Sequence, residues 1–282
     1  MKFTKMQGIG NDYVYVNCFQ EKIAAPSDLA VRISDRHFGV GSDGLILICP
    51  SEIADFQMVM YNSDGSRAQM CGNGVRCVGK YVHDKGLTSK TTVTVETLAG
   101  VKTLALHLRE DGTVGSVTVD MGAPILCPSD IPALGAGDSF VNQPLMVDGT
   151  EWLVTAVSMG KPHAIVYVDN TEHLDLPAIG PGFEHHPAFP ERINTEFLQV
   201  IDRHTIRMRV WERGAGETLA CGTGACASLV ASVLTGKTDR EATLRLLGGD
   251  LFIRWDPDTG HVFMTGPAEF VFEGEYPIST KE

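Results

Sequence analysis

Two short stretches of the chain carry the residues best suited to chemistry, Gln69–Gly74 (QMCGNG) and Leu219–Gly224 (LACGTG). Each places a cysteine, Cys71 or Cys221, directly ahead of a glycine-rich turn that leads into an apolar run with helical periodicity. The two cysteines lie 150 residues apart. One such motif would carry little weight, whereas two copies indicate a matched pair of reactive groups.

A thiol at the start of a helix is suited to a specific kind of chemistry. The free backbone N–H groups and partial positive charge of a helix amino terminus bind carboxylates and lower the pKa of a nearby thiol. Two such turns facing one another could hold one carboxylate, with a sulfur on each face of the adjacent carbon. One thiolate would then remove the α-proton while the other thiol delivers a proton, which inverts the carbon. The glycines that would let the backbone approach a ligand are Gly72, Gly74, Gly222 and Gly224.

The same spacing relates other parts of the chain. A shift of 150 residues aligns the first half with the second beyond the cysteine turns themselves. We therefore expect a duplicated fold whose two turns face each other across a pseudo-twofold axis, with a cleft between them. Three further polar or glycine positions coincide under this shift, Asn11 with Lys161, Gly44 with Asn194, and Asn62 with Glu212.

The elements that must position these residues are mostly strands. Apolar periodicity predicts a helix from an N-cap at Ser27 to about Arg36, and one helix after each cysteine, ending at Gly86 and Gly236. Short alternating segments elsewhere predict strands. Residues 39–44 fit the letters G-x-G-x-x-G but precede a strand, so they are interpreted as a turn and not as a dinucleotide site. The stretch rich in proline and glycine at 122–144 is expected to be a linker and 177–190 a loop.

Composition narrows the class of protein. The 282 residues are 43% hydrophobic, enough for two ordinary domains with a boundary near residue 121. A net charge of −12 argues against a nucleic acid or an anionic membrane as a partner. The first residues lack the apolar core of a signal peptide, and no window is long enough to span a bilayer, so we expect a cytoplasmic protein.

Other residues have simpler interpretations. The seven cysteines include no C-x-x-C, and the histidines show no ligand spacing, so no metal site is expected. Cys77 and Cys226 are expected in the core. His163 by default makes an ordinary hydrogen bond, and His163 and Gly44 are expected to support the site. A single cysteine is more often buried than catalytic, and only the pairing of Cys71 with Cys221 favours catalysis.

The residues around both turns resemble those of diaminopimelate epimerases, which interconvert LL- and meso-diaminopimelate for lysine and peptidoglycan synthesis without pyridoxal phosphate. The resemblance covers nearly the whole chain. It rests on Lys5–Asp12, Tyr61–Ser66, Cys71–Cys77, Val157–His163, Glu191–Asn194 and Glu212–Gly224.

The resemblance implies an α/β (α+β) fold of two pseudo-symmetric domains, each a mostly antiparallel sheet curled around a central helix, with the active site in the cleft between them. The domains would be 1–121 plus 267–282, and 122–266. Cys71 and Cys221 would be the bases, no cofactor would be needed, and the protein would be a homodimer. Gly72, Asn73, Gly222 and Thr223 would bind the reacting carboxylate, and Asn11, Asn62, Asn194, Glu212 and Arg213 the distal end of a small diamino dicarboxylate.

Two positions depart from the family pattern. Lys161 stands where the family usually has an asparagine that contacts substrate, and Gly44 where some members have glutamine. A lysine either reaches a substrate carboxylate or changes which side chain is accepted. The alternatives are therefore a racemase of another amino acid, such as histidine, and a non-catalytic amino-acid-binding protein. Two facing thiols could also form a disulfide.

Overall fold

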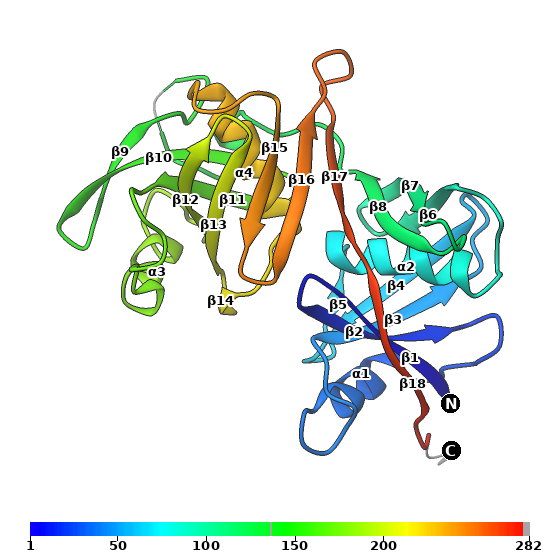
Figure 1. The fold of residues 1–282 in the computed structure, drawn as a ribbon. Coiled ribbons are helices and arrows are strands. Elements are labelled where there is room, and N and C mark those ends of the chain that lie inside the picture. The colour runs from blue at the N-terminus through cyan, green and yellow to red at the C-terminus, as the bar shows by residue number, and fades with distance from the viewer. Residues whose placement is uncertain (136, 279–282) are drawn as a thin grey trace. The chain divides into compact units, whose positions relative to one another are not determined.

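The structure, a computed structural model, describes residues 1–135 and 137–278. The chain forms two compact units, one of Met1–Val119 together with the chain from Gly266 onward, and one of Asp120–Thr265. Each unit is a sheet with a helix packed on either face, which confirms the expected mixed α/β class (Figure 1). No helix in the described ranges has the length and apolar character needed to cross a membrane.

The sheet of the first unit has eight main strands, and only the β2–β3 and β4–β6 neighbours are parallel. A two-residue strand, β5 (Arg67–Ala68), adds to β4 just before Cys71. In sheet order the main strands are β18 (Glu269–Glu275), β1 (Lys2–Gly8), β2 (Asn11–Asn17), β3 (Gly44–Cys49), β4 (Phe56–Asn62), β6 (Thr92–Thr97), β7 (Gly100–Leu108) and β8 (Val114–Asp120).

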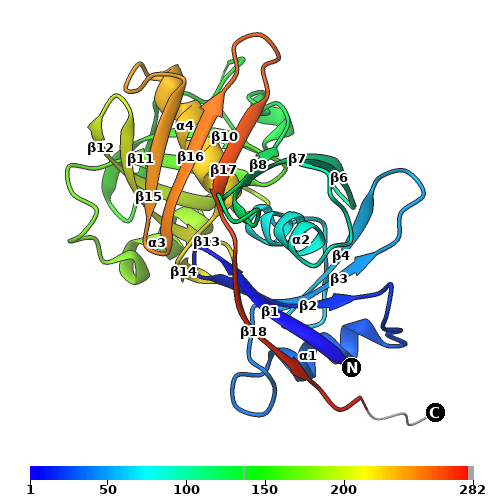
Figure 2. The ribbon, with the colours of Figure 1, turned by 45° about the vertical axis from the view of Figure 1, so that its right-hand side comes forward.

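Helix α2 (Gly72–Asp84) is enclosed by this sheet (Figure 2). Its first eleven residues are buried, and it packs on β1, β2 and β7. Helix α1 (Pro26–Ser34) covers the other face, where Leu29 and Ile33 pack with Val14 and Leu45. Because alternate residues of a strand face opposite sides, the central strands β2 and β3 are apolar on both faces.

The second unit repeats this order and these strand directions, with the parallel pairs at β11–β12 and β13–β15. The short β14 (Gly216–Thr218) lies on β13 ahead of Cys221, as β5 lies on β4. In sheet order the main strands are β9 (Gln143–Val147), β10 (Thr150–Ser158), β11 (Pro162–Tyr167), β12 (Asn194–Asp202), β13 (Thr205–Glu212), β15 (Glu241–Leu246), β16 (Gly249–Trp255) and β17 (Val262–Pro267).

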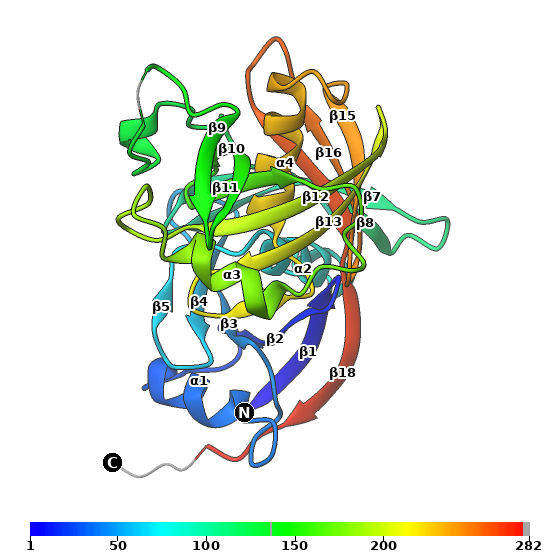
Figure 3. The ribbon, with the colours of Figure 1, turned by 90° about the vertical axis from the view of Figure 1, so that its left-hand side faces the viewer.

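The two faces of this second sheet carry different helices. Helix α4 (Gly222–Leu234) packs on β10, β11, β12, β15 and β16. Helix α3 (Leu176–Glu184) packs on β12, β13 and β14, and Figure 3 shows it on the outer side of that sheet. Phe197 of β12 meets Phe183 of α3 with ring centroids 5.4 Å apart, so the neighbouring residue of β12, Glu196, faces α4.

Three local expectations were wrong. Helix α1 ends at Ser34, and Ser27 lies inside it and donates to the carbonyl of Gly65 instead of capping the helix. Residues 177–190 are largely helix α3, because Asp175 caps its start and a proline suits the first turn. The expected linker at 122–144 places Ile131, Ala133 and Phe140 in the core of the second unit.

Candidate functional site

Both cysteines occupy the N-cap position of a long helix. Cys71 precedes α2 and Cys221 precedes α4, and each sulfur accepts the backbone N–H of the glycine three residues on, Gly74 or Gly224, at 3.3 Å. The thiols therefore lie at the positive ends of two helix dipoles, an environment that favours a thiolate. Gly72 and Gly222 are the first residues of the two helices.

Around Cys71 the partners are amides and carboxylates. The Cys71 thiol donates to Asn11 Oδ1 at 3.1 Å, and Asn11 Nδ2 donates to Asp43 Oδ2 at 2.7 Å. Asp43 also pairs with Arg36 at 3.1 Å. Burial raises the pKa of the neighbouring Tyr13 phenol, and the Cys71 charge adds to this effect. The amide of Asn11 is thus oriented by a carboxylate, and it directs the thiol in turn.

The remaining predicted residues of the first unit lie at the ends of α2 and of two strands. Asn73 is buried, and its Oδ1 accepts from Arg76 Nη1 at 2.9 Å. Asn62 ends β4, where its amide donates to Ser66 Oγ at 2.9 Å. Gly44 pairs with Asn62 in the sheet, and a Cβ at Gly44 would lie 2.1 Å from the carbonyl oxygen of Tyr61. A side chain at 44 would therefore force the neighbouring backbone of β4 to shift.

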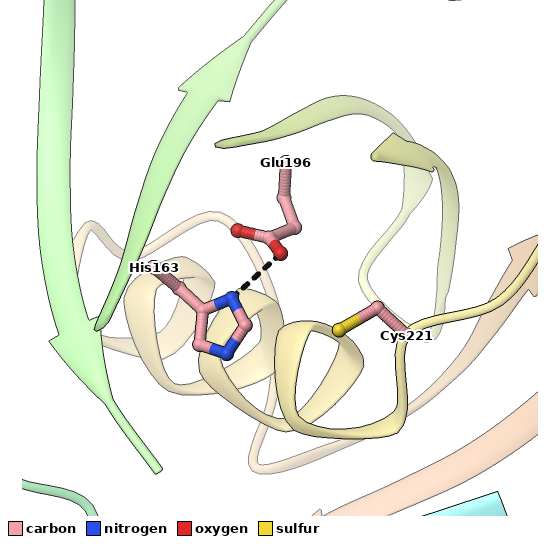
Figure 4. A group of neighbouring side chains, drawn as sticks. All are labelled: His163, Glu196 and Cys221. Atoms are coloured by element: carbon pink, nitrogen blue, oxygen red, sulfur yellow. Dashed lines mark hydrogen bonds and ion pairs between the residues drawn. The ribbon is translucent and has the colours of Figure 1, made fainter. Parts of the chain in front are cut away.

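Around Cys221 the partners are groups that can exchange protons. Thr223 Oγ1 lies 3.5 Å from Cys221 Sγ and 3.1 Å from His163 Nε2. His163 Nδ1 lies 2.7 Å from Glu196 Oε1, and both side chains are fully buried (Figure 4). Sequence spacing suggested an ordinary hydrogen bond for His163, and its partners turn out to be a buried carboxyl and the hydroxyl beside the cysteine.

The charges near Cys221 favour its thiol form. Burial raises the pKa of Cys221 well above its usual value, and the nearby charges of Glu212 and Glu196 raise it further. The charge of Lys161 and the hydrogen bond to Thr223 act in the opposite direction. Burial also raises the pKa of Glu196, an effect that the charge of His163 opposes.

The other predicted residues of the second unit lie where strands β12 and β13 meet the loops. Asn194 Oδ1 accepts the backbone N–H of Arg213 at 2.9 Å, and Glu212 Oε1 accepts from Thr218 Oγ1 at 2.6 Å. Arg213 is exposed and donates to the carbonyl of Glu191 at 2.9 Å. Lys161 is exposed just ahead of β11.

His163, Glu196 and Cys221 form the one group in the described residues whose donor atoms, all within 4.8 Å of one another, could hold a metal ion. The 2.7 Å separation of Nδ1 and Oε1 is that of a hydrogen bond. Two zinc ligands, each about 2.0–2.1 Å from the ion, stand farther apart than that. In this arrangement the pair shares a proton.

Sequence reasoning missed Tyr13, Arg36, Asp43 and Glu196. Three of them surround Cys71 through turns and strand ends with no distinctive motif. Glu196 had a visible signal, because it is a charged residue directly ahead of the apolar pair Phe197–Leu198 in β12, and the 150-residue shift places it on Ile46.

Two solved structures share the fold of this chain. A probable proline racemase from Agrobacterium radiobacter aligns with a TM-score of 0.72 at 14% identity, over 99% of this chain and 93% of that one. A PhzF-family phenazine biosynthesis protein from Bacillus anthracis aligns with a TM-score of 0.68 at 16% identity, over 99% of both chains.

The family profile for diaminopimelate epimerase matches residues 3–127 and 155–271. Diaminopimelate epimerases from Acetivibrio thermocellus and Desulfovibrio desulfuricans are 61% and 58% identical, over 99% of this chain and 99% of each relative. The one from Methanococcus maripaludis is 55% identical over 99% of this chain and 100% of its own length. The chain belongs to the diaminopimelate epimerase family and is an isomerase.

Proposed function

We propose that the protein interconverts LL- and meso-diaminopimelate by two-base proton transfer at one α-carbon, with Cys71 and Cys221 as the bases. The observation that carries this proposal is the matched capping of α2 and α4, in which each sulfur lies 3.3 Å from the N–H of a helix's first turn. Relatives at 55–61% identity bear the same family name, which favours diaminopimelate over a single amino acid such as histidine.

The proton transfer is balanced between the two sulfurs. The thiolate on one face removes the α-proton, so a Cα–H bond breaks and an S–H bond forms. The thiol on the opposite face delivers its proton to the α-carbon, which breaks its S–H bond and forms a new Cα–H bond. No electrons are gained or lost, and the carbon is inverted. After each inversion the thiol and thiolate have exchanged places.

The acidity of the α-proton depends on the adjacent carboxylate. The N–H groups of Gly72, Asn73, Gly222 and Thr223 come before the first N–H groups that donate within the helices, those of Val75 and Ala225, so helix geometry leaves them without an intrahelical partner. We assign these four groups to the reacting carboxylate. Fixed N–H dipoles would stabilise the negative charge that develops as the proton leaves.

Recognition of the substrate falls to side chains that differ between the halves. We assign Asn11, Asn62, Asn194, Glu212 and Arg213 to the distal carboxylate and ammonium, in a cleft between the two units. The guanidinium of Arg213 suits the distal carboxylate because it can bind bidentately. Gly44 would act by packing alone. The family resemblance further supports a cytoplasmic homodimer, and light scattering at working concentration would test the oligomeric state.

Solvent exchange tests the two-base assignment. In deuterated water the wild-type protein should place solvent deuterium at the α-carbon of diaminopimelate. Cys71→Ala and Cys221→Ala should each reduce epimerisation by about 1,000-fold or more, because each removes a proton donor or acceptor used in every turnover. Mass spectrometry of the product and separation of the stereoisomers provide the measurement.

Cys127→Ala is the matched control, because Cys127 is an exposed thiol outside the two helix turns. It should retain wild-type turnover. Full epimerase activity in Cys71→Ala or in Cys221→Ala would contradict the assignment.

A further inference from the structure

The carboxyl of Glu196 is an unusual feature of the second unit. Glu196 is fully buried on β12, and it faces α4. Its Oε1 bonds His163, while its Oε2 has no hydrogen-bond partner within the described residues. A buried carboxyl costs free energy unless its charge and hydrogen bonds are compensated. A buried carboxyl with only one of its two oxygens hydrogen-bonded therefore indicates a functional role for Glu196.

A continuous set of polar contacts leads from this carboxyl to the cysteine. Glu196 Oε1 lies 2.7 Å from His163 Nδ1, and His163 Nε2 lies 3.1 Å from Thr223 Oγ1. Thr223 Oγ1 in turn lies 3.5 Å from the Cys221 sulfur. Figure 4 shows His163, Glu196 and Cys221 converging on the start of α4. We name the path through Glu196, His163, Thr223 and Cys221 the relay.

The backbone of α4 leaves room for the carboxyl. A Cβ added at Gly224 would lie 2.3 Å from Glu196 Oε1 and 3.2 Å from Cys221 Sγ. The carboxyl and the sulfur are thus both packed against the same glycine of the first helical turn. Any side chain at 224 would displace one of them, so the helix start accommodates Glu196 as closely as it accommodates the cysteine.

The first unit builds the same helix start without a carboxyl. The 150-residue shift places Glu196 on Ile46, His163 on Tyr13 and Thr223 on Asn73. At Gly74, an added Cβ would meet the Ile46 Cδ1 methyl at 2.8 Å. Cys71 nevertheless caps α2 with the same 3.3 Å bond. Since an isoleucine suffices for this architecture, Glu196 is not needed to form a cysteine-capped helix.

We propose that Glu196 is a positioning residue that governs the protonation of Cys221 through His163 and Thr223, so that Cys221 can return from thiol to thiolate between turnovers. The proposal rests on the proposed function, in which each inversion leaves the two cysteines in exchanged protonation states.

The relay moves a proton without a net change in atoms or charge. A carboxylate at Nδ1 selects the tautomer of His163 that carries Nδ1–H and leaves Nε2 as an acceptor. The Cys221 S–H proton passes to Thr223 Oγ1 while the Thr223 hydroxyl proton passes to His163 Nε2. The products are a thiolate and an imidazolium, and the imidazolium is paired with Glu196. The reverse shift restores the thiol.

The charged groups around the sulfur explain why Cys221 needs such a path. Glu196 on β12 and Glu212 at the end of β13 disfavour the thiolate, whereas Lys161 ahead of β11 and Thr223 on α4 favour it. Burial is the largest cause of the raised pKa of Cys221. Direct loss of the proton to water is therefore unfavourable, and a neighbouring internal base supplies the alternative.

Glu196→Gln provides the test, because glutamine keeps the size and an oxygen that can accept Nδ1–H but removes the charge. We expect kcat to fall about tenfold or more with KM within about twofold of wild type, since the imidazolium loses its partner while substrate contacts remain. Glu196→Ile, which installs the residue of the first unit, should lower kcat further because it also removes the acceptor.

Thiol alkylation separates this role from a structural one. The pH dependence of iodoacetamide labelling is read by peptide mass spectrometry, with Cys71 in the same sample as the internal reference. In Glu196→Gln the midpoint for Cys221 should move to lower pH, by about one unit, because a negative charge beside the sulfur is gone. The Cys221 thiolate then forms at lower pH while turnover slows. Simple loss of packing does not produce this combination.

Each outcome decides the proposal. A lower kcat together with a shifted Cys221 midpoint supports it. An unchanged Cys221 midpoint overturns it, whether turnover and melting temperature are retained or both fall, and so does a shifted midpoint with unchanged kcat. Failure of the proposed function is seen separately, as full epimerase activity retained in Cys221→Ala. If Glu196→Ile does not fold, the glutamine variant alone decides.

Discussion

The two cysteine turns share a backbone and differ in what surrounds it. Each cysteine caps a 13-residue helix with the same 3.3 Å bond to a glycine N–H. Cys71 is half-buried and bonds an amide, whereas Cys221 is buried and bonds a hydroxyl that leads to a histidine. The duplicated backbone thus fixes the positions of the two thiols, while the neighbouring side chains set the protonation of each thiol separately.

The network on the Cys71 side is ionic and reaches the surface. Asn11 bonds Asp43, and Arg36, whose side chain is 60% exposed, pairs with Asp43 and Asp12. An amide and ion-paired carboxylates make up this network, and it orients the thiol through Asn11. The network on the Cys221 side contains a histidine, the side chain whose protonation changes most readily near neutral pH.

Phenylalanine in place of His163 or of Tyr13, its equivalent in the first unit, should give the largest difference in kcat between the two sides. His163→Phe should lower kcat by about 1,000-fold, because it removes the internal base and leaves Glu196 buried without its partner. Tyr13→Phe removes one hydroxyl near Cys71 and should lower kcat less than about tenfold. Steady-state kinetics in both directions of the reaction measures the difference.

Thermal melts of both phenylalanine variants provide the control for folding. Equal losses of kcat in His163→Phe and Tyr13→Phe, with both proteins folded, would show that the two sides work alike and would remove the basis for the relay.

Alanine in place of Gly74 or Gly224, whose N–H groups bond the cysteine sulfurs, should give the next largest difference in kcat between the two sides. Gly224→Ala forces a Cβ to within 2.3 Å of Glu196 Oε1, an atom held by His163. Gly74→Ala brings a Cβ to 2.8 Å from Ile46 Cδ1, the free end of a flexible side chain. We expect a loss of about 100-fold in kcat for Gly224→Ala and less than about tenfold for Gly74→Ala, since a methyl group can rotate away at a cost of about 1 kcal/mol.

The glycine pair is its own matched control, because both positions lie three residues after the cysteine in helices of equal length. Circular dichroism should show both helices intact. A larger loss of kcat in Gly74→Ala than in Gly224→Ala would argue that the Glu196 carboxyl is mobile. The close approach of a Cβ at 224 to that carboxyl would then not affect catalysis.

Much of the fold was accessible from the sequence, because hydrophobic periodicity and the 150-residue repeat are both visible there. The repeat could have corrected one error, since shifting α1 (Pro26–Ser34) by 150 residues gives 176–184, the position of α3. Its prolines instead suggested a loop, but tertiary packing of Phe183 on Phe197 outweighs that local preference.

The side-chain networks were less accessible than the elements. Cys71, Cys221 and the glycines carry a motif, so their helix-capping positions follow from local sequence. Asp43 and Glu196 act through partners 32 and 33 residues away in the chain, and no local pattern encodes such pairs. Only the register of parallel neighbours, His163 beside Asn194 on β11 and β12, brings the Glu196 carboxyl next to the imidazole.

Lys161→Gln should have the smallest effect, and the opposite sign to Glu196→Gln. The charge of Lys161 lowers the pKa of Cys221, so its removal should raise that pKa and move the midpoint of Cys221 alkylation to higher pH, by less than about one unit. Because Lys161 is exposed, added salt should shrink the difference from wild type, whereas the effect of the buried Glu196 should persist. Lys22→Gln, at an exposed lysine of the first unit, is the control and should leave the Cys221 midpoint unchanged. A Lys161→Gln shift that is large and independent of salt would mean that this lysine approaches the sulfur directly, and the electrostatic contrast between the two cysteines would then depend on it as much as on Glu196.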